Sequence, residues 1–135
     1  MTWSFNVEPG GLVRPDPGAE RPMLRATLED CAESLSPAGT QPSLSTYWVD
    51  QLLAGLSPAG PTEAVVADGN AWSLERRGDL VIASSQYAEE GEDVEAVSAD
   101  ELVVALMEYR DTIQRSIESG HRLDDRSWAQ RNPAD

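Results

Sequence analysis

The stretch SADELVVALMEYRDTIQRSIESG, residues 98–120, decides the fold because it carries the most regular pattern in the chain. Ser98 followed by Glu101 fits a capping box, in which the Ser98 hydroxyl accepts the Glu101 amide hydrogen and the Glu101 carboxylate reaches back to the Ser98 amide. Gly120 suits the position just after a last helical turn. The stretch therefore predicts a helix of about 21 residues, nearly 30 Å long.

The apolar residues of this stretch predict which face of the helix is buried. They recur at intervals of three and four residues, as one side of an α-helix requires. The row consists of Leu102, Leu106, Tyr109, Ile113 and Ile117. We expect this row to pack against the domain, while Asp100 and Glu101 are stabilised at the positive end of the helix dipole.

Upstream of the helix, EAVVADGNAWSLERRGDLVIASSQY, residues 63–87, predicts an antiparallel meander. Turn residues at 68–70 and 77–79 separate three segments that are rich in strand-forming residues. A further short strand is expected within residues 92–97. A shorter helix is predicted before the meander, over residues 43–56, because every fourth residue of one row is apolar. That row consists of Leu44, Trp48, Leu52 and Leu56, and Gly55 and Pro58 end the helix.

The N-terminal third is divided by proline and glycine. Residues 3–7 and 24–28 alternate apolar and polar side chains, which predicts two strands. Residues 9–22 are expected to form a loop, because proline and glycine interrupt regular hydrogen bonding.

Together these elements predict one α+β domain over residues 1–120. We expect an antiparallel sheet of about four to six strands, with the long C-terminal helix packed on one face and the shorter helix before the central meander. The alternative is a mixed sheet with the 43–56 helix between its strands. Residues 121–135 are predicted to form a polar tail, in which Trp128 is the residue that would dock it on the domain.

The composition excludes several classes of protein. The chain has 135 residues, and its ten Arg, with no Lys, face 24 acidic residues, so the net charge is −14. Nucleic-acid phosphates and anionic membranes both require a basic face, so neither is an expected partner. One cysteine excludes an internal disulfide and a cysteine-rich zinc site. Neither a long apolar segment nor a signal-peptide pattern is present, so we expect a cytoplasmic protein.

Residues that often carry catalysis stand in unfavourable settings. His121 follows the long helix, where a charged imidazole suits the negative helix end. Cys31 is expected to act as a small buried hydrophobe, because a catalytic thiolate needs a histidine and an electropositive setting. The acidic run of residues 89–93 lacks the ligand spacing of an EF-hand. We therefore assign no catalytic, cofactor-binding or metal-binding residue.

Acidic residues concentrate between Arg77 and Arg110, where the chain has no other Arg, and five of the seven residues 89–95 are acidic. Negative charges gathered in one segment attract a positively charged partner and accelerate its association. The candidate partner-binding residues are Asp79, Glu89, Glu90, Glu92, Asp93 and Glu95. The alternative is that this segment only keeps the protein soluble.

The sequence contains the run NAWSLE at residues 70–75 and the run RGDLV at residues 77–81, followed by the helix predicted over residues 98–119. This combination resembles small, acidic, uncharacterised actinobacterial proteins of the polymorphic-toxin immunity type. The resemblance covers residues 45–120 and includes no diagnostic motif. It implies a protein that binds a basic toxin, often a nuclease, and blocks it by stoichiometric binding. Two other functions stay open: a small enzyme that uses carboxylates in a pocket, and a stable domain that dimerises through its helix.

Overall fold

The computed structural model describes residues 3–37, 39, 41–57, 61–87 and 94–120. The elements, in chain order, are β1 (Ser4–Val7), β2 (Val13–Asp16), α1 (Pro22–Cys31), α2 (Tyr47–Gly55), β3 (Glu63–Asp68), β4 (Trp72–Arg77), β5 (Leu80–Ser85), β6 (Glu95–Ser98) and α3 (Ala99–Glu118). β1 and β2 form an antiparallel hairpin, and β3 to β6 form a four-stranded antiparallel sheet in chain order. The predicted tail, with His121 and Trp128, lies outside the described residues.

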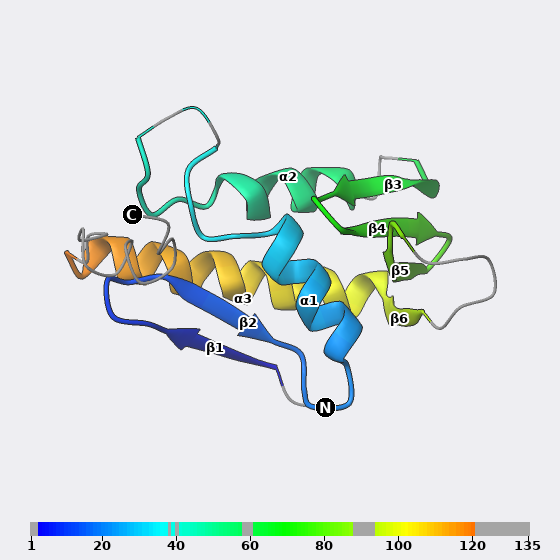
Figure 1. Cartoon of the computed structure of the whole chain (residues 1–135), viewed down its shortest axis with the longest axis horizontal. Helices are drawn as coiled ribbons and strands as arrows, with labels where there is room; N and C mark the ends of the chain where they lie inside the picture. The colour runs from blue at the N-terminus through cyan, green and yellow to red at the C-terminus, as the bar shows by residue number, and fades with distance from the viewer. Residues whose placement is uncertain (1–2, 38, 40, 58–60, 88–93, 121–135) are drawn as a thin grey trace.

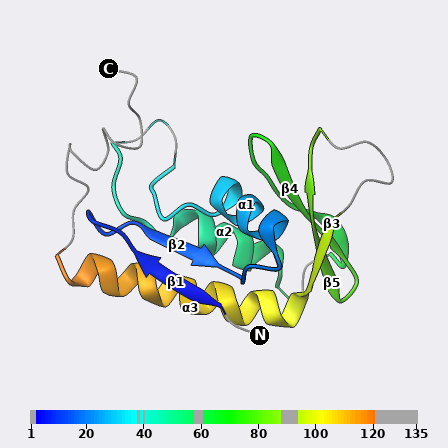
Figure 2. The same cartoon turned by 60° about the horizontal axis from the view of Figure 1, so that its bottom comes forward.

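Helix α3 runs the length of the molecule, and the other elements are arranged around it (Figure 1). The four-stranded sheet lies at its N-terminal end, the hairpin lies along one side, and α2 lies along the other (Figures 1 and 2). Helix α1 packs against β4, β5 and β2. The predicted α+β class, the meander, the short helix and the long C-terminal helix are confirmed.

The buried face of α3 follows the predicted row at Leu102, Leu106, Tyr109 and Ile113. These side chains join a core to which α1, α2, β2 and the sheet also contribute. Its largest fully buried members include Leu24, Leu28, Val49, Leu52, Leu74 and Val81. The row is wrong at Ile117, which is 36% exposed. Ser116 is buried instead, because its hydroxyl donates to the Gly11 carbonyl in the hairpin turn at 2.8 Å.

Half of the predicted capping box is present. The Ser98 hydroxyl accepts the Glu101 amide hydrogen at 3.0 Å. The Glu101 carboxylate does not turn back to Ser98 but accepts hydrogen bonds from the Trp3 indole, at 2.9 Å, and from the Arg21 guanidinium. Burial raises the pKa of Glu101, yet the bonds from Arg21 and Trp3 outweigh it, so the pKa lies below its ordinary value. This carboxylate therefore ties the N-terminal segment to the first turn of α3.

The strand predicted over residues 24–28 is wrong, because this segment belongs to helix α1. Leu24, Thr27, Leu28 and Cys31 are buried, which is a helical spacing of three and four residues. Leu24 and Leu28 fit a strand and a helix equally well, so the short alternation could not separate the two periods. Pro22 at the first helical position favours the helix, because its fixed φ suits a first turn.

The loop predicted over residues 9–22 is wrong in part, because Val13–Asp16 forms strand β2. β2 pairs with one strand only, so Pro15, which has no amide hydrogen, is tolerated within it. The other side of β2 is bonded by side chains: Val13 N donates to the Ser34 hydroxyl at 3.0 Å. Proline therefore marks a strand with a single partner here rather than an irregular loop.

Tyr109 joins three distant segments of the chain in the interior. Its side chain is 1% exposed, and its ring stacks on Phe5 of β1 with ring centroids 5.7 Å apart. Its hydroxyl lies 2.6 Å from the Ala32 carbonyl after α1 and 3.2 Å from the Val13 carbonyl of β2. One phenol thus satisfies buried acceptors that the secondary structure leaves open.

Replacing Tyr109 with Phe should lower the free energy of unfolding by about 1–3 kcal/mol, because the Ala32 carbonyl loses the phenol as its donor while the ring keeps its packing. The Val13 carbonyl keeps a second donor, the Ser34 hydroxyl at 3.3 Å. Urea unfolding measures this difference. Tyr47→Phe is the matched control, since Tyr47 is 39% exposed. Equal stability of the Tyr109→Phe variant and the wild type would show that the phenol is not required.

Replacing Leu106 with Asp should lower the free energy of unfolding by more than about 4 kcal/mol, because an unpaired charge enters the core. Val104→Asp places the same charge on the same helix at a side chain that is 60% exposed, and should change stability by less than about 0.5 kcal/mol. Thermal unfolding compares the two variants. Similar melting temperatures would contradict the assignment of the buried face.

Candidate functional site

The described arginines are all engaged within the molecule. Five of them form ion pairs: Arg14 with Glu8 and Glu29, Arg21 with Glu101, Arg25 with Glu29, Arg77 with Glu75, and Arg110 with Asp50. Arg76 donates to the carbonyl groups of Leu56, Ser57 and Gly78, and Arg115 donates to the Thr112 hydroxyl. Single surface ion pairs contribute little to stability, but they place these five guanidinium groups beside carboxylates of the same molecule.

The described part of the chain therefore presents an acidic surface. It contains seventeen acidic side chains against these seven arginines. Glu33 aside, eleven of the described acidic side chains take no part in these ion pairs. Such a surface attracts cations over a distance of about one Debye length, roughly 8–10 Å at physiological salt.

The predicted partner-binding residues divide into three groups. Asp79 is exposed in the turn between β4 and β5. Glu95 lies at the other end of the β5–β6 pair, where it pairs with Ala83, so the structure does not bring it together with Asp79. Glu89, Glu90, Glu92 and Asp93 lie outside the described residues.

Glu95 has a structural contact that its sequence position did not predict. Its Oε1 atom accepts the Leu24 amide hydrogen at 2.9 Å, in the first turn of α1. Arg21, the residue before this helix, provides no side-chain cap. The amide groups of a first helical turn need an outside acceptor, so Glu95 caps α1 from strand β6.

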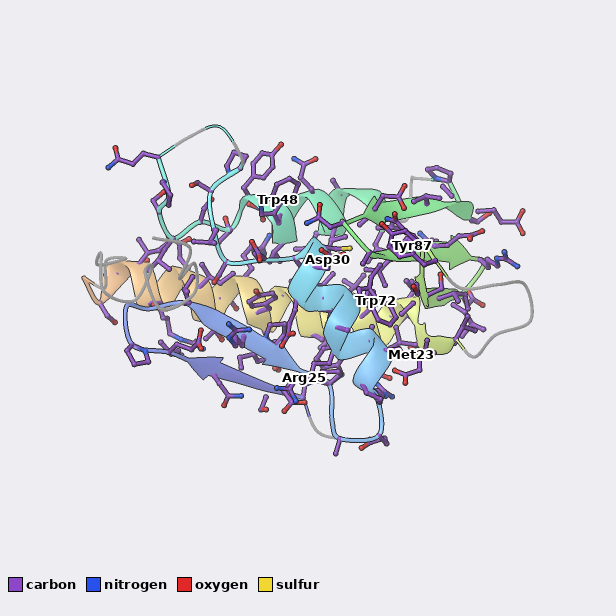
Figure 3. All side chains as sticks on the ribbon, in the orientation of Figure 1. Met23, Arg25, Asp30, Trp48, Trp72 and Tyr87 are labelled. Atoms are coloured by element: carbon purple, nitrogen blue, oxygen red, sulfur yellow. The ribbon has the colours of Figure 1, made fainter. Side chains whose placement is uncertain are left out.

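A hollow of ≈ 550 Å³ opens between the end of α1, the start of α2 and the β3–β4 turn. Figure 3 shows Asp30 at the end of α1 and Trp48 at the start of α2. The polar part of its lining includes Asp30, Glu33, Asp68 and Asn70, and the apolar part includes Cys31, Leu35, Pro37, Pro42 and Trp48. No pattern in the sequence indicates this hollow, because its residues come from three separate segments that no motif connects.

Asp30 holds the β3–β4 turn in place. Its Oδ2 atom accepts the amide hydrogens of Ala71 and Trp72, at 2.9 and 3.0 Å. Burial raises the pKa of Asp30, but the bonds from these amides and from the Asn70 amide outweigh it and leave the pKa below its ordinary value. A Cβ atom on Gly69 would stand 2.3 Å from Oδ2, so this close approach requires glycine.

Cys31 is buried beside Asp30, as the sequence predicts for a small hydrophobe. Its sulfur lies 3.5 Å from the Trp72 carbonyl oxygen. Burial, with the negative charges of Asp30 and Asp68, raises the pKa of the thiol to about 12. The thiolate is the nucleophilic form, so burial of Cys31 disfavours that form at neutral pH.

The hollow suits an organic cation better than a metal ion. Three carboxylates and an indole ring line it, and none of the seven arginines in the described part of the chain does. Within the described ranges, no three His, Cys, Asp or Glu side chains are grouped as ligands of a metal ion. An aromatic face together with carboxylates is a typical setting for a guanidinium or ammonium group.

The hollow lies close to the residues that precede the acidic segment, which is here residues 88–93. Gln86 Nε2 donates to the Gly69 carbonyl at 2.8 Å, and Gln86 N donates to the Ala71 carbonyl at 2.8 Å. The next residue, Tyr87, is 79% exposed, more than any other large apolar side chain in the described part. Residues 88–93, which contain four of the predicted partner-binding acids, follow Tyr87 in the sequence.

No protein-family model, curated protein sequence or solved structure matches this chain. None of the helices in the described residues is long and apolar enough to span a membrane.

Replacing Asp30 with Asn should lower the free energy of unfolding at pH 7 by about 1–2 kcal/mol, because the hydrogen bonds to Ala71 and Trp72 lose their charged acceptor. The pKa of Asp30 in the folded state lies below the ordinary value of an aspartate, which applies in the unfolded chain. Its contribution is therefore complete above that value and is lost as the pH falls further.

Urea unfolding of the wild type and the Asp30→Asn variant, from pH 7 to about pH 2.5, should show their difference shrinking toward zero. Asp79→Asn removes an exposed charge and should differ from the wild type by less than about 0.5 kcal/mol at every pH. A constant difference between the wild type and Asp30→Asn would mean that the ionised carboxylate is not what holds the turn.

Proposed function

We propose that this protein binds a basic protein partner stoichiometrically, in the manner of an immunity protein that blocks a bacterial toxin. The observation that carries the proposal is the excess of carboxylates over arginines: every described arginine has a partner within the molecule, and eleven described acidic side chains other than Glu33 lie outside the ion pairs. A nuclease must be basic to hold its substrate, so an acidic protein is complementary to that class of toxin.

Tyr87 supports an interface near the acidic segment. Tyrosine is enriched among the residues that dominate binding energy, because it offers a large rigid ring and a polar hydroxyl. Its ring is 79% exposed and directly precedes residues 88–93. An exposed aromatic residue next to a run of carboxylates suits a partner surface with an apolar centre and a basic rim.

A carboxylate enzyme is the less supported alternative. General acid–base catalysis needs a carboxyl group whose pKa approaches the working pH. In the hollow, the pKa of Asp30 is lowered instead, and its Oδ2 atom is occupied by two backbone amides. Burial keeps the Cys31 thiol protonated. These groups favour binding over chemistry at this site.

Affinity capture from the native host, at low and high salt, tests the proposed function. We expect the immobilised protein to retain one basic protein in a one-to-one ratio at low salt and to release it at high salt. Recovery of acidic or neutral proteins only, in amounts independent of salt, would contradict the proposal. A toxin gene beside the gene for this protein would support the immunity role specifically.

Changing Glu89, Glu90, Glu92 and Asp93 to Gln and Asn should leave the fold intact and slow association with the captured partner at least about tenfold at low salt. The difference should shrink as salt rises. The matched control changes Glu63, Glu108, Asp111 and Glu118 to their amides, which removes four charges elsewhere. Stopped-flow or surface-binding kinetics measure the rates; an unchanged rate would place the interface outside this segment.

A further inference from the structure

We propose that the hollow between α1, α2 and the β3–β4 turn receives an arginine side chain of the basic partner. The inference rests on the proposed function and gives its interface a specific pocket. The hollow has a volume of ≈ 550 Å³, which is ample for one long side chain, and it combines an indole ring with carboxylates. These are the groups that a guanidinium contacts best, by stacking and by paired hydrogen bonds.

The charge around the hollow selects a cation. Asp30, Glu33 and Asp68 line it, and no arginine of the described ranges is among its lining residues. Two backbone amides hold the Asp30 carboxylate at the base of the β3–β4 turn, and its lowered pKa keeps it ionised at neutral pH. An incoming guanidinium therefore meets a fixed negative charge that needs little rearrangement.

The apolar part of the lining suits the rest of an arginine side chain. Leu35, Pro37 and Pro42 can cover the methylene groups, while the Trp48 indole in the lining is a ring on which a guanidinium can stack. A lysine ammonium fits the charge but not the flat surface. A small hydrated cation gains nothing from the apolar lining. The mixed lining thus favours arginine over both.

The position of the hollow links it to the proposed docking segment. Gln86 bonds the β3–β4 turn, which forms part of the lining, and Tyr87 and the acidic residues follow it directly. A basic surface that contacts Tyr87 therefore lies near the hollow. A second copy of this chain is a poor occupant, because it is also strongly acidic and like charges repel.

The first test uses a tripeptide probe and nuclear magnetic resonance. The capped peptide acetyl-Gly-Arg-Gly-amide is titrated into ¹⁵N-labelled protein, with the neutral citrulline analogue as the matched control. We expect saturable shifts at the amides of Gly69 and Asn70 and at the Trp48 indole N–H with the arginine peptide only. Equal shifts with the citrulline peptide, or shifts spread evenly over the acidic surface, would overturn the proposal.

Single substitutions distinguish binding in the hollow from non-specific attraction by the negative charge of the whole surface. Asp68→Asn removes a charge inside the hollow and should weaken peptide binding about threefold, while Asp111→Asn removes an exposed charge of α3 outside it and should not. Trp48→Leu should weaken binding roughly twofold to fivefold through the lost indole ring. Thermal unfolding confirms that each variant is folded. Equal effects of Asp68→Asn and Asp111→Asn would contradict a defined pocket.

The captured partner separates this inference from the proposed function. If the partner is basic and its dissociation accelerates with Asp68→Asn and Trp48→Leu but not with Asp111→Asn, both proposals are supported. If the partner binds but neither substitution in the hollow changes its dissociation, the pocket is wrong and the proposed function stands. If the arginine peptide binds but no basic protein is captured, the hollow does not receive its arginine from a basic protein partner. The proposed function is then wrong.

Discussion

The buried hydroxyl of Tyr109 is the contact on which the arrangement of the N-terminal third depends. α3 supplies the phenol, while the hairpin and the end of α1 supply the Val13 and Ala32 carbonyl groups near it. The ring also stacks on Phe5, which stacks on Trp3 in turn. Because a buried carbonyl without a donor costs about 1–3 kcal/mol, the hairpin and α1 are fixed in position relative to α3. That placement brings the end of α1 to the β3–β4 turn, where the hollow forms.

Three carboxylates complete this arrangement, and they give the acidic composition a structural role. Asp30 bonds the amides of the β3–β4 turn, Glu95 caps α1, and Glu101 holds Trp3 and Arg21. Each accepts hydrogen bonds from residues more than 40 positions away in the sequence. Charge-assisted bonds of this kind are about twice as strong as neutral ones, so a small domain benefits from them. Part of the −14 charge therefore supports the fold.

The sequence predicts the C-terminal half of the fold well and the N-terminal third poorly, for one physical reason. Residues 63–118 carry long periodic patterns with turn residues and a cap, so local preferences alone select the meander and α3. Residues 13–31 carry short patterns that fit both the period of a strand and the period of a helix. Contacts with α3 and the sheet decide between the two. The same limit applies to the site. The acidic segment is visible as composition, but the hollow depends on Asp30, Trp48 and Asp68, which only the folded chain brings together.

The division of the acidic residues bears on how binding evolves without loss of the fold. Carboxylates such as Glu95 and Glu101 cannot change freely, because each satisfies donors inside the domain. Exposed residues such as Asp79 and Asp68 carry no such constraint from a buried donor, since surface charges contribute little to stability. In the proposed complex, specificity for one basic partner over another can therefore change at the rim of the hollow and in the acidic segment. Asp30, by contrast, serves both purposes: it fixes the turn through one oxygen atom and contributes negative charge to the hollow. A substitution there alters the fold and the site together, so its effect on binding is interpretable only when stability is measured in parallel.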